Sequence, residues 1–571
     1  MAQSKKHAAE EISTWDVLAS VFEERAENLS RQELEAWSAQ SPRDSAILSK
    51  LKGPGSKLLT GPRGSGKSTL LRKAYFELLE DREVLPAYVN YARALALEPM
   101  FHTHANALQL FRQWIIFKVI DGIHSSVLEM QQSAPPEMLE LANYGQLLIR
   151  SLEVGDPPAI LDKAVSPSEL LVLLESWTEQ LGCRRCVLLL DDAAHAFSQE
   201  QQQQFFEIFR ELRSRRVSGK AAVYPGTTSY SPFFHVGHEA EVLEAWYHPD
   251  DDSFLPIMRS IVERRLTPSL LSRLEGRQEI IDYLALASFG LPRGFLNMLS
   301  QFLGVEEGTP VQPNRSRAVG AVADHAESVR GIFLALSSKL PRFKHFVEVG
   351  KELEGSVIRR LRSYNKGRDV KQKAVVVAIE EPIRTELDRI LNFLEYAGLV
   401  RKMSSVSRGV KGRFQRYTLH YAIVLAENVL SLGKSYTLAA AVEALRSRSA
   451  HAFVRGRGET FLGAKFAERC KLDLPPCGSC GAPRVSPEQR YCMRCGAELT
   501  NVSIYEELLK APIDELPLTK SRIARIKAHT DLRTMQDVIL DDELQTIRTV
   551  PYIGPIWASR IRNYAQEFVS V

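Results

Sequence analysis

An eight-residue segment at 61–68, GPRGSGKS, constrains the fold of this chain more than any other feature. It matches the pattern GxxxxGK[ST], in which glycines let the backbone curl so that its N–H groups point inward at phosphate oxygens. An apolar strand signal at 57–60 precedes the segment, and STLLRKAYFELLED follows with helical spacing. Strand, glycine-rich loop and helix in this order predict a P-loop that holds nucleotide phosphates at the amino end of the helix.

The P-loop and a second strand predict a site for ATP and Mg²⁺. Lys67 is expected to reach the β and γ phosphates, and Ser68 to hold Mg²⁺. VLLLDD at 187–192 predicts a buried strand that delivers Asp191 beside the metal; a strand ending in a capping Asp pair is the alternative. The expected nucleotide-binding residues are Gly61, Pro62, Arg63, Gly64, Ser65, Gly66, Lys67, Ser68 and Thr69.

Two further segments add catalytic candidates. AAVYPGTTS at 221–229 ends a strand where Thr228 could sense the γ phosphate, and a simple turn is the alternative. GLPR at 290–293 begins a helix that could bring Arg293 to the phosphates from a lid domain. An ordinary helix start with a surface arginine is the alternative there.

Strands separated by helices predict an α/β P-loop NTPase, with a parallel sheet and helices on both faces. Composition shifts and breaker residues divide the rest of the chain. The expected segments are an N-terminal helical segment (1–45), the P-loop ATPase core (46–245), a helical lid (246–305), a basic winged-helix-like domain (320–435), a helical connector (436–475), a zinc ribbon (476–500) and a small all-α, helix-hairpin-helix-like domain (503–571).

GPRGSGKS, LLLDD, the TTS strand end and GLPR, followed by the winged-helix-like stretch, resemble the Orc/Cdc6-like branch of AAA+ ATPases over residues 45–425. STAND signalling ATPases look similar, since they share a DD ending and a GxP lid motif. The resemblance implies ATP hydrolysis with Mg²⁺ and an ATP-dependent homo-oligomer. Asp192 stands where related ATPases carry a water-activating Glu. Its side chain is one methylene shorter, which predicts slow hydrolysis or a conformational change before it.

Residues 339–420 form a basic block with 19 Lys and Arg against 9 Asp and Glu, a local charge of +10 in a chain of +4. Such a block is typical of a nucleic-acid contact, and a solvated basic face is the alternative. TELDRILNFLEYAGLVRKM, a basic turn and QRYTLH follow the order helix, strand, turn, strand of a winged helix, which favours double-stranded DNA as partner. The expected phosphate contacts are Arg401, Lys402, Arg408, Lys411, Arg413 and Arg416.

Two CxxC pairs, separated by eleven residues, predict a zinc ribbon. With four thiolates and no open position, Zn²⁺ there is expected to be structural. A third pair, Cys183 and Cys186, leads directly into the predicted strand, which favours core residues. The zinc ligands are expected to be Cys477, Cys480, Cys492 and Cys495.

The last 60 residues resemble the C-terminal domain of the bacterial RNA polymerase α subunit, with a helix-hairpin-helix at 548–568. Tyr552 stands where the hairpin usually has its first Gly, and Pro555 removes one N–H donor. Residues 501–571 hold 9 Lys and Arg against 10 Asp and Glu, so this module is not basic. A protein-binding or packing role therefore stands beside DNA contact.

Together these features predict a multi-domain ATPase that couples nucleotide state to double-stranded DNA binding, in a mobile-element, replication or defence setting. The alternative is a STAND-like signalling switch that hydrolyses ATP slowly and recognises a protein partner through the zinc ribbon and the C-terminal module. No apolar run approaches the ~20 residues that cross a bilayer, so no membrane contact is expected. The polar start and the paired cysteines predict a cytoplasmic protein.

Overall fold

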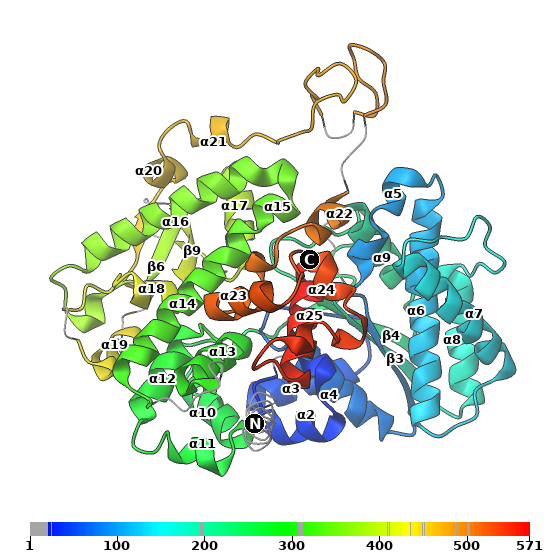
Figure 1. The fold of residues 1–571 in the computed structure, drawn as a ribbon, viewed down its shortest axis with the longest axis horizontal. Helices are drawn as coiled ribbons and strands as arrows, with labels where there is room; N and C mark the ends of the chain where they lie inside the picture. Colours follow the sequence, from blue (N-terminus) through cyan, green and yellow to red (C-terminus); the bar gives the residue numbers. More distant parts are fainter. Residues whose placement is uncertain are drawn as a thin grey trace.

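The computed structural model describes residues 21–23, 25–193, 199–305, 312–407, 409, 412–433, 436–447, 449, 451–486, 489–499 and 503–570. Most of these residues pack into one body, from which the zinc-ribbon segment projects (Figure 1). Among the described residues, no helix has the length and apolarity to cross a membrane.

A five-stranded parallel sheet organises the ATPase core. Its order, β2-β3-β4-β1-β5, places β4 between the P-loop strand β1 and the DD strand β3. Six of the seven residues of β3 are buried, as expected for a parallel strand covered on both faces. The strands are β1 (Lys57–Thr60), β2 (Val84–Asn90), β3 (Arg185–Asp191), β4 (Val217–Val223) and β5 (Glu241–Glu244).

Helices cover both faces of this sheet because successive side chains of a strand point to opposite sides. Leu59 packs with α3 and α4, whereas Leu58 packs with the larger layer of α6 to α9. The expected α/β class is therefore confirmed, and the long interval before β3 holds three of these helices. The helices of the core are α2 (Arg31–Trp37), α3 (Pro42–Lys52), α4 (Lys67–Leu79), α5 (Met100–Thr103), α6 (Ala107–Glu129), α7 (Pro136–Glu153), α8 (Pro167–Gln180) and α9 (Gln199–Glu211), with short 3₁₀ turns η1 (Ala26–Asn28) and η2 (Ala94–Leu97).

The lid is all helical, as expected. Pro292, at the first position of α13, suits a helix start because it has no N–H to leave unpaired. The lid shares one continuous hydrophobic core with the winged-helix and C-terminal domains. Its helices are α10 (Phe254–Arg265), α11 (Pro268–Ser272), α12 (Gln278–Ala287) and α13 (Pro292–Leu303).

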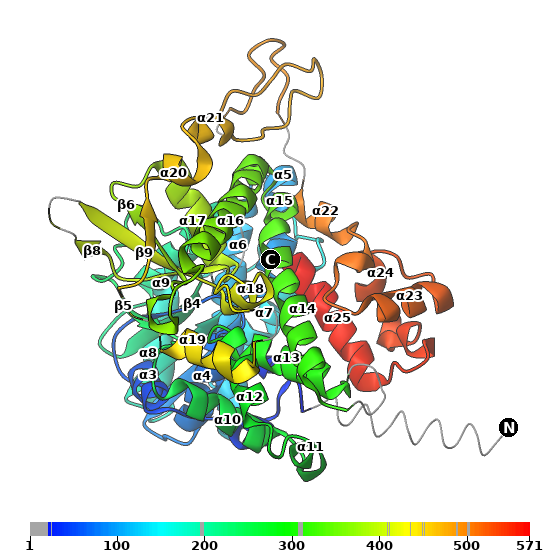
Figure 2. The same cartoon turned by 90° about the vertical axis from the view of Figure 1, so that its left-hand side faces the viewer.

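The next domain has the predicted helix, strand, turn and strand. Strand β9 pairs antiparallel with β6, β7 and β8, which forms the wing hairpin. Figure 2 shows β8 and β9 extending away from the body. The elements are α14 (Arg315–Leu334), α15 (Leu336–Lys339), η4 (Pro341–Phe343), α16 (Lys344–Asn365), η5 (Val370–Gln372), β6 (Val376–Glu380), α17 (Thr385–Tyr396), β7 (Val400–Lys402), β8 (Val406–Ser407), β9 (Arg413–Leu419) and α18 (Tyr421–Ala426).

The connector differs from the helical segment expected at 436–475. It contains strand β10 (Val454–Gly456), which pairs parallel with β6 and becomes the edge of the winged-helix sheet. The three-residue strand is too short to show alternation in the sequence, and it forms only because β6 offers a free edge. The helices around it are α19 (Leu438–Arg446), α20 (Gly458–Leu462) and α21 (Phe466–Arg469).

The C-terminal domain, residues 503–570, lies between the core helices and the lid in Figure 1. Tyr552 has φ 66°, the left-handed conformation in which a hairpin of this kind normally uses Gly. Its elements are α22 (Ile504–Leu509), η7 (Ile513–Glu515), α23 (Lys520–His529), α24 (Met535–Ile539), η8 (Asp542–Leu544), η9 (Ile547–Thr549) and α25 (Pro555–Ser570).

Candidate nucleotide site and metal centre

The P-loop connects β1 to α4 as the sequence predicts. Gly64 and Gly66 have φ of 78° and 94°, which residues with a Cβ adopt only with strain. Gly64 is further constrained by the lid, because a Cβ there would lie 2.8 Å from the Cβ of Arg293. The Arg293 N–H also donates to the Gly64 carbonyl at 3.4 Å. The loop therefore sits directly under the start of α13.

Lys67 is folded across its own loop. Its Nζ donates to the carbonyl oxygens of Gly61 at 2.7 Å and Pro62 at 3.1 Å, and lies 3.8 Å from the centre of the Tyr224 ring. Burial lowers the pKa of Lys67 to about 7, although Asp192 and Asp191 oppose that change. A bound triphosphate would supply the negative charge that favours the ammonium form.

Asp191 ends β3 at the same edge of the sheet as the P-loop. The Tyr88 hydroxyl donates to its Oδ2 at 2.7 Å. Burial and the nearby Asp192 raise the pKa of Asp191 to about 7, while hydrogen bonds from Tyr88 and Ser68 oppose the change. The Ser68 hydroxyl and a carboxylate are oxygen ligands of the kind that Mg²⁺ takes, so these two residues fit the metal.

Tyr224 is a site residue that the motifs did not indicate. It directly follows β4, and its hydroxyl donates to Asp192 Oδ1 at 2.7 Å while its ring faces Lys67. Thr228, the residue expected to sense phosphate, instead donates to the Tyr224 carbonyl at 2.8 Å and accepts from the Tyr224 N–H at 3.1 Å. The turn is thus the better interpretation of Thr228, because its hydroxyl already closes that turn.

The P-loop lines a cavity of 710 Å³. A cavity of this size suits a nucleotide. It is lined by the loop and Tyr224, by Arg293 of the lid, by residues 25–27 and by the C-terminal domain. Arg293 is therefore at the site, as predicted, and its Nη1 lies 2.8 Å from Glu567 Oε1 of α25. The contribution of the C-terminal domain had no signal in the sequence.

The four ribbon cysteines come together as predicted. Their sulfur atoms all lie within 4.8 Å of one another, with 3.6 Å from Cys477 to Cys495 and from Cys480 to Cys492. Tetrahedral zinc with ~2.3 Å bonds to sulfur requires sulfur atoms about 3.8 Å apart, so the arrangement fits Zn²⁺. N–H groups of Cys495 and Arg494 lower the pKa of Cys492 to about 6, which favours the thiolate.

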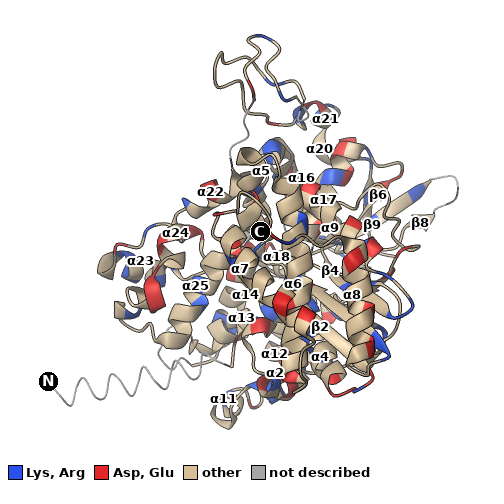
Figure 3. Ribbon diagram, turned by 90° about the vertical axis from the view of Figure 1, so that its right-hand side faces the viewer, with Lys and Arg blue, Asp and Glu red and all other residues tan. Residues whose placement is uncertain are grey.

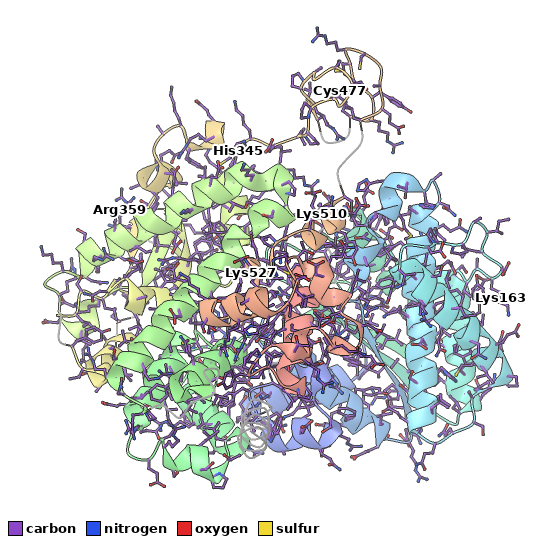
Figure 4. All side chains as sticks on the ribbon, viewed as in Figure 1. Lys163, His345, Arg359, Cys477, Lys510 and Lys527 are labelled. Atoms are coloured by element: carbon purple, nitrogen blue, oxygen red, sulfur yellow. The ribbon has the colours of Figure 1, made fainter. Side chains whose placement is uncertain are left out.

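Each cysteine pair closes a tight turn that ends in a glycine. Gly481 and Gly496 have φ of 67° and 69°, and their N–H groups donate to the carbonyls of Cys477 and Cys492 at 2.8 and 2.9 Å. Cys477 is labelled in the projecting segment in Figure 4. Cys186, in contrast, lies fully buried in β3, which confirms the core interpretation of that pair.

The basic candidates divide into buried and exposed side chains. Arg401 is only 5% exposed; its guanidinium lies 2.6 Å from Glu244 and over the Trp246 ring. The expected phosphate contact is therefore wrong for Arg401, which joins the winged helix to the ATPase core. Lys402 at the end of β7 and Arg413 at the start of β9 are exposed. Figure 3 shows the β8–β9 hairpin projecting from the body.

Arg416 is partly buried and donates to the Ser404 carbonyl at 2.9 Å, which fixes it along the hairpin. Arg408 and Lys411 lie outside the described residues. The part of the wing that the structure describes thus presents Lys402 and Arg413 as its exposed cations from the predicted set.

The strand order, the P-loop and the placement of Asp191 together define an α/β P-loop NTPase. Comparison with solved structures finds a Cdc6 protein of Pyrobaculum aerophilum, with 16% identity and a TM-score of 0.29, covering 75% of this chain and 98% of that one. Orc1 of Aeropyrum pernix in complex with DNA has 18% identity and a TM-score of 0.27, covering 69% and 93%.

The Drosophila ORC bound to DNA gives 14% identity and a TM-score of 0.29, covering 69% of this chain and 97% of that one. No family model and no curated protein sequence matches the chain.

Proposed function

We propose that this protein binds and hydrolyses ATP with Mg²⁺ and couples its nucleotide state to double-stranded DNA binding by the winged helix. The observation that supports this most is the position of Tyr224. On one side it contacts Lys67 and Asp192 of the nucleotide site, and on the other its ring lies 5.9 Å from that of Tyr396 in α17.

The loop after β4 is fitted closely to α17. A Cβ at Gly226 would overlap the backbone carbonyl of Asn392, so loop and helix cannot slide freely past each other. When Lys67 turns to the phosphates of ATP, it leaves the face of Tyr224 and a cation–π contact is lost. The loop and α17 then have a different preferred arrangement. ATP would therefore bind the two arrangements with unequal affinity, which is what coupling requires.

DNA contact is assigned to the wing because it projects and is basic. Side chains such as Lys402 and Arg413 would lie along the phosphates, where they contribute affinity without reading sequence. Zn²⁺ would be held by the four ribbon cysteines in a structural role, and the projecting ribbon remains a candidate surface for a protein partner.

The wing is tested by the salt dependence of duplex binding. Replacing Lys402 and Arg413 together by Ala should weaken binding and reduce the slope of log K against log salt by about 1.8, at ~0.9 per lost phosphate contact. The matched control is Arg184→Ala with Arg216→Ala, which removes two exposed cations from the ATPase core and should leave the slope unchanged. Equal slopes for the wing variant and the wild type would exclude the wing from the interface.

A STAND-like switch is the second candidate, and the position of α17 favours it. Six of its twelve residues are buried, among them Leu387 and Ile390, and Asn392 lies against the loop after β4. A helix so covered is not free to enter a DNA groove until the domain moves. In this case a partner protein, rather than duplex DNA, would alter ATP turnover.

A further inference from the structure

The last helix of the chain places a carboxylate inside the nucleotide cavity. Glu567 of α25 meets three arginines that come from three different parts of the protein. Its Oε1 lies 2.8 Å from Arg63 of the P-loop and 2.8 Å from Arg293 of the lid, and its Oε2 lies 2.7 Å from Arg25. Arg25 also donates to the Asn563 carbonyl of the same helix at 2.9 Å.

The three arginines, which we call the arginine seat, form a site for an oxyanion. Converging guanidinium groups bind carboxylates and phosphates through the same charge-assisted hydrogen bonds. Glu567 is 17% exposed; burial would raise its pKa, but Arg63, Arg293 and Arg25 hold that pKa well below its ordinary value. The group is therefore a carboxylate anion.

The seat keeps positive charge even with Glu567 in place. Glu27 adds a second carboxylate, 3.0 Å from Arg25. Three guanidinium groups and two carboxylates leave one net positive charge beside the P-loop. A phosphate group carries more negative charge and more acceptor oxygens than a carboxylate, so it is the stronger ligand for such a cluster.

The rest of the C-terminal domain covers the same cavity. Tyr505 and Leu509 of α22 and Leu540 after α24 line its wall. Two further contacts attach the domain: Ser503 donates to Glu98 Oε2 at 2.7 Å, and Lys339 lies 4.8 Å from the ring centre of Phe568. A nucleotide on the P-loop would thus meet this domain on the opposite wall.

We infer that the C-terminal domain is a nucleotide-responsive cap, in which Glu567 occupies the arginine seat when no nucleotide is bound and a phosphate group of ATP displaces it. The inference rests on the proposed nucleotide site. Displacement removes the attachment of α25 to the P-loop, the lid and Arg25 at once. Helix α25 is therefore released from the P-loop and the lid in the ATP state, while the Ser503–Glu98 hydrogen bond and the shared hydrophobic core still hold the domain.

Hydrogen–deuterium exchange of the full chain tests the cap. Saturating ATP should speed exchange in residues 555–570 of the wild type, while β3 stays protected. Glu567→Gln, which keeps the shape and removes the charge, should show that fast exchange without ATP and bind ATP on the order of tenfold more tightly. Arg25→Ala should also speed exchange in α25. Because it removes the same ion pair from the other side, it shows whether the effect of Glu567→Gln comes from the lost pair or from a folding defect of that variant.

The matched control is Glu507→Gln, which neutralises an exposed carboxylate of the same domain that pairs with Lys510, the residue directly after helix α22. Exchange and ATP affinity of this control should equal those of the wild type. Calorimetry with ATP distinguishes a failure of the proposed cap from a failure of the proposed nucleotide site. ATP binding with unchanged exchange in 555–570 and an unchanged affinity in Glu567→Gln would overturn the cap alone. Absence of ATP binding in both the wild type and Glu567→Gln would overturn the proposed nucleotide site, on which the cap rests.

Discussion

Replacing Lys67 by Ala is expected to abolish measurable ATP binding. The loop places Nζ where it can leave the carbonyls of Gly61 and Pro62 for phosphate oxygens. Charge-assisted hydrogen bonds of this kind contribute about 1.5–3 kcal/mol each, so the loss of two weakens binding by roughly 10²- to 10⁴-fold. Titration calorimetry with ATP measures the effect directly.

The Lys67 variant should remain folded, which makes the result interpretable. In the structure this ammonium is buried, donates to two carbonyls of its own loop and lies over the Tyr224 ring, so Ala removes a desolvated charge and one cation–π contact. Lys73→Ala is the matched control, since Lys73 lies on the same helix and outside the cavity. ATP affinity of Lys67→Ala equal to that of the wild type would place the nucleotide elsewhere.

Removal of the zinc ligands should have the second large effect. Cys492→Ser is expected to lose the metal and unfold the ribbon, because a structural Zn²⁺ contributes on the order of 10–16 kcal/mol to such small segments. The ribbon projects from the body, so the ATPase core should keep its thermal transition. Metal analysis should give one zinc per wild-type chain and none for the variant.

Cys470→Ser is the control for the ribbon. Cys470 is also buried near this segment, but it lies outside the four-sulfur cluster. The Cys470→Ser protein should therefore retain one zinc per chain. A wild-type protein without zinc, or a Cys492→Ser protein with its full metal content, would contradict the assignment.

The sequence predicted those features that local patterns encode. The P-loop, Asp191 and the four cysteines are each fixed by a few neighbouring residues, and the structure brings them together as expected. The winged helix was predictable for the same reason, because its strands flank one basic turn. Its sheet gained β10 only through pairing with β6, a contact that no local pattern specifies.

The roles of Glu567 and Tyr224 and the burial of Arg401 could not be predicted from the sequence, because they depend on contacts between distant parts of the chain. Arg293 and Glu567 are 274 positions apart, and only the packing of the C-terminal domain brings them together. Arg401 has the local context of a wing residue, yet Glu244 and Trp246 of the core bury it. Tyr224 stands three residues before the more conspicuous Thr227 and Thr228, and its role follows from its contacts with Lys67 and Asp192.

Coupling between nucleotide turnover and duplex binding is what most distinguishes the proposed function from a signalling switch. The most direct measurement is the ATPase rate of the zinc-loaded full chain with and without double-stranded DNA, with Lys67→Ala as the blank. We expect a stimulation of several fold that disappears in Lys67→Ala, and also at high salt because phosphate contacts are screened. A slow rate that is the same with and without duplex DNA would contradict the coupling and favour a switch that responds to a protein partner.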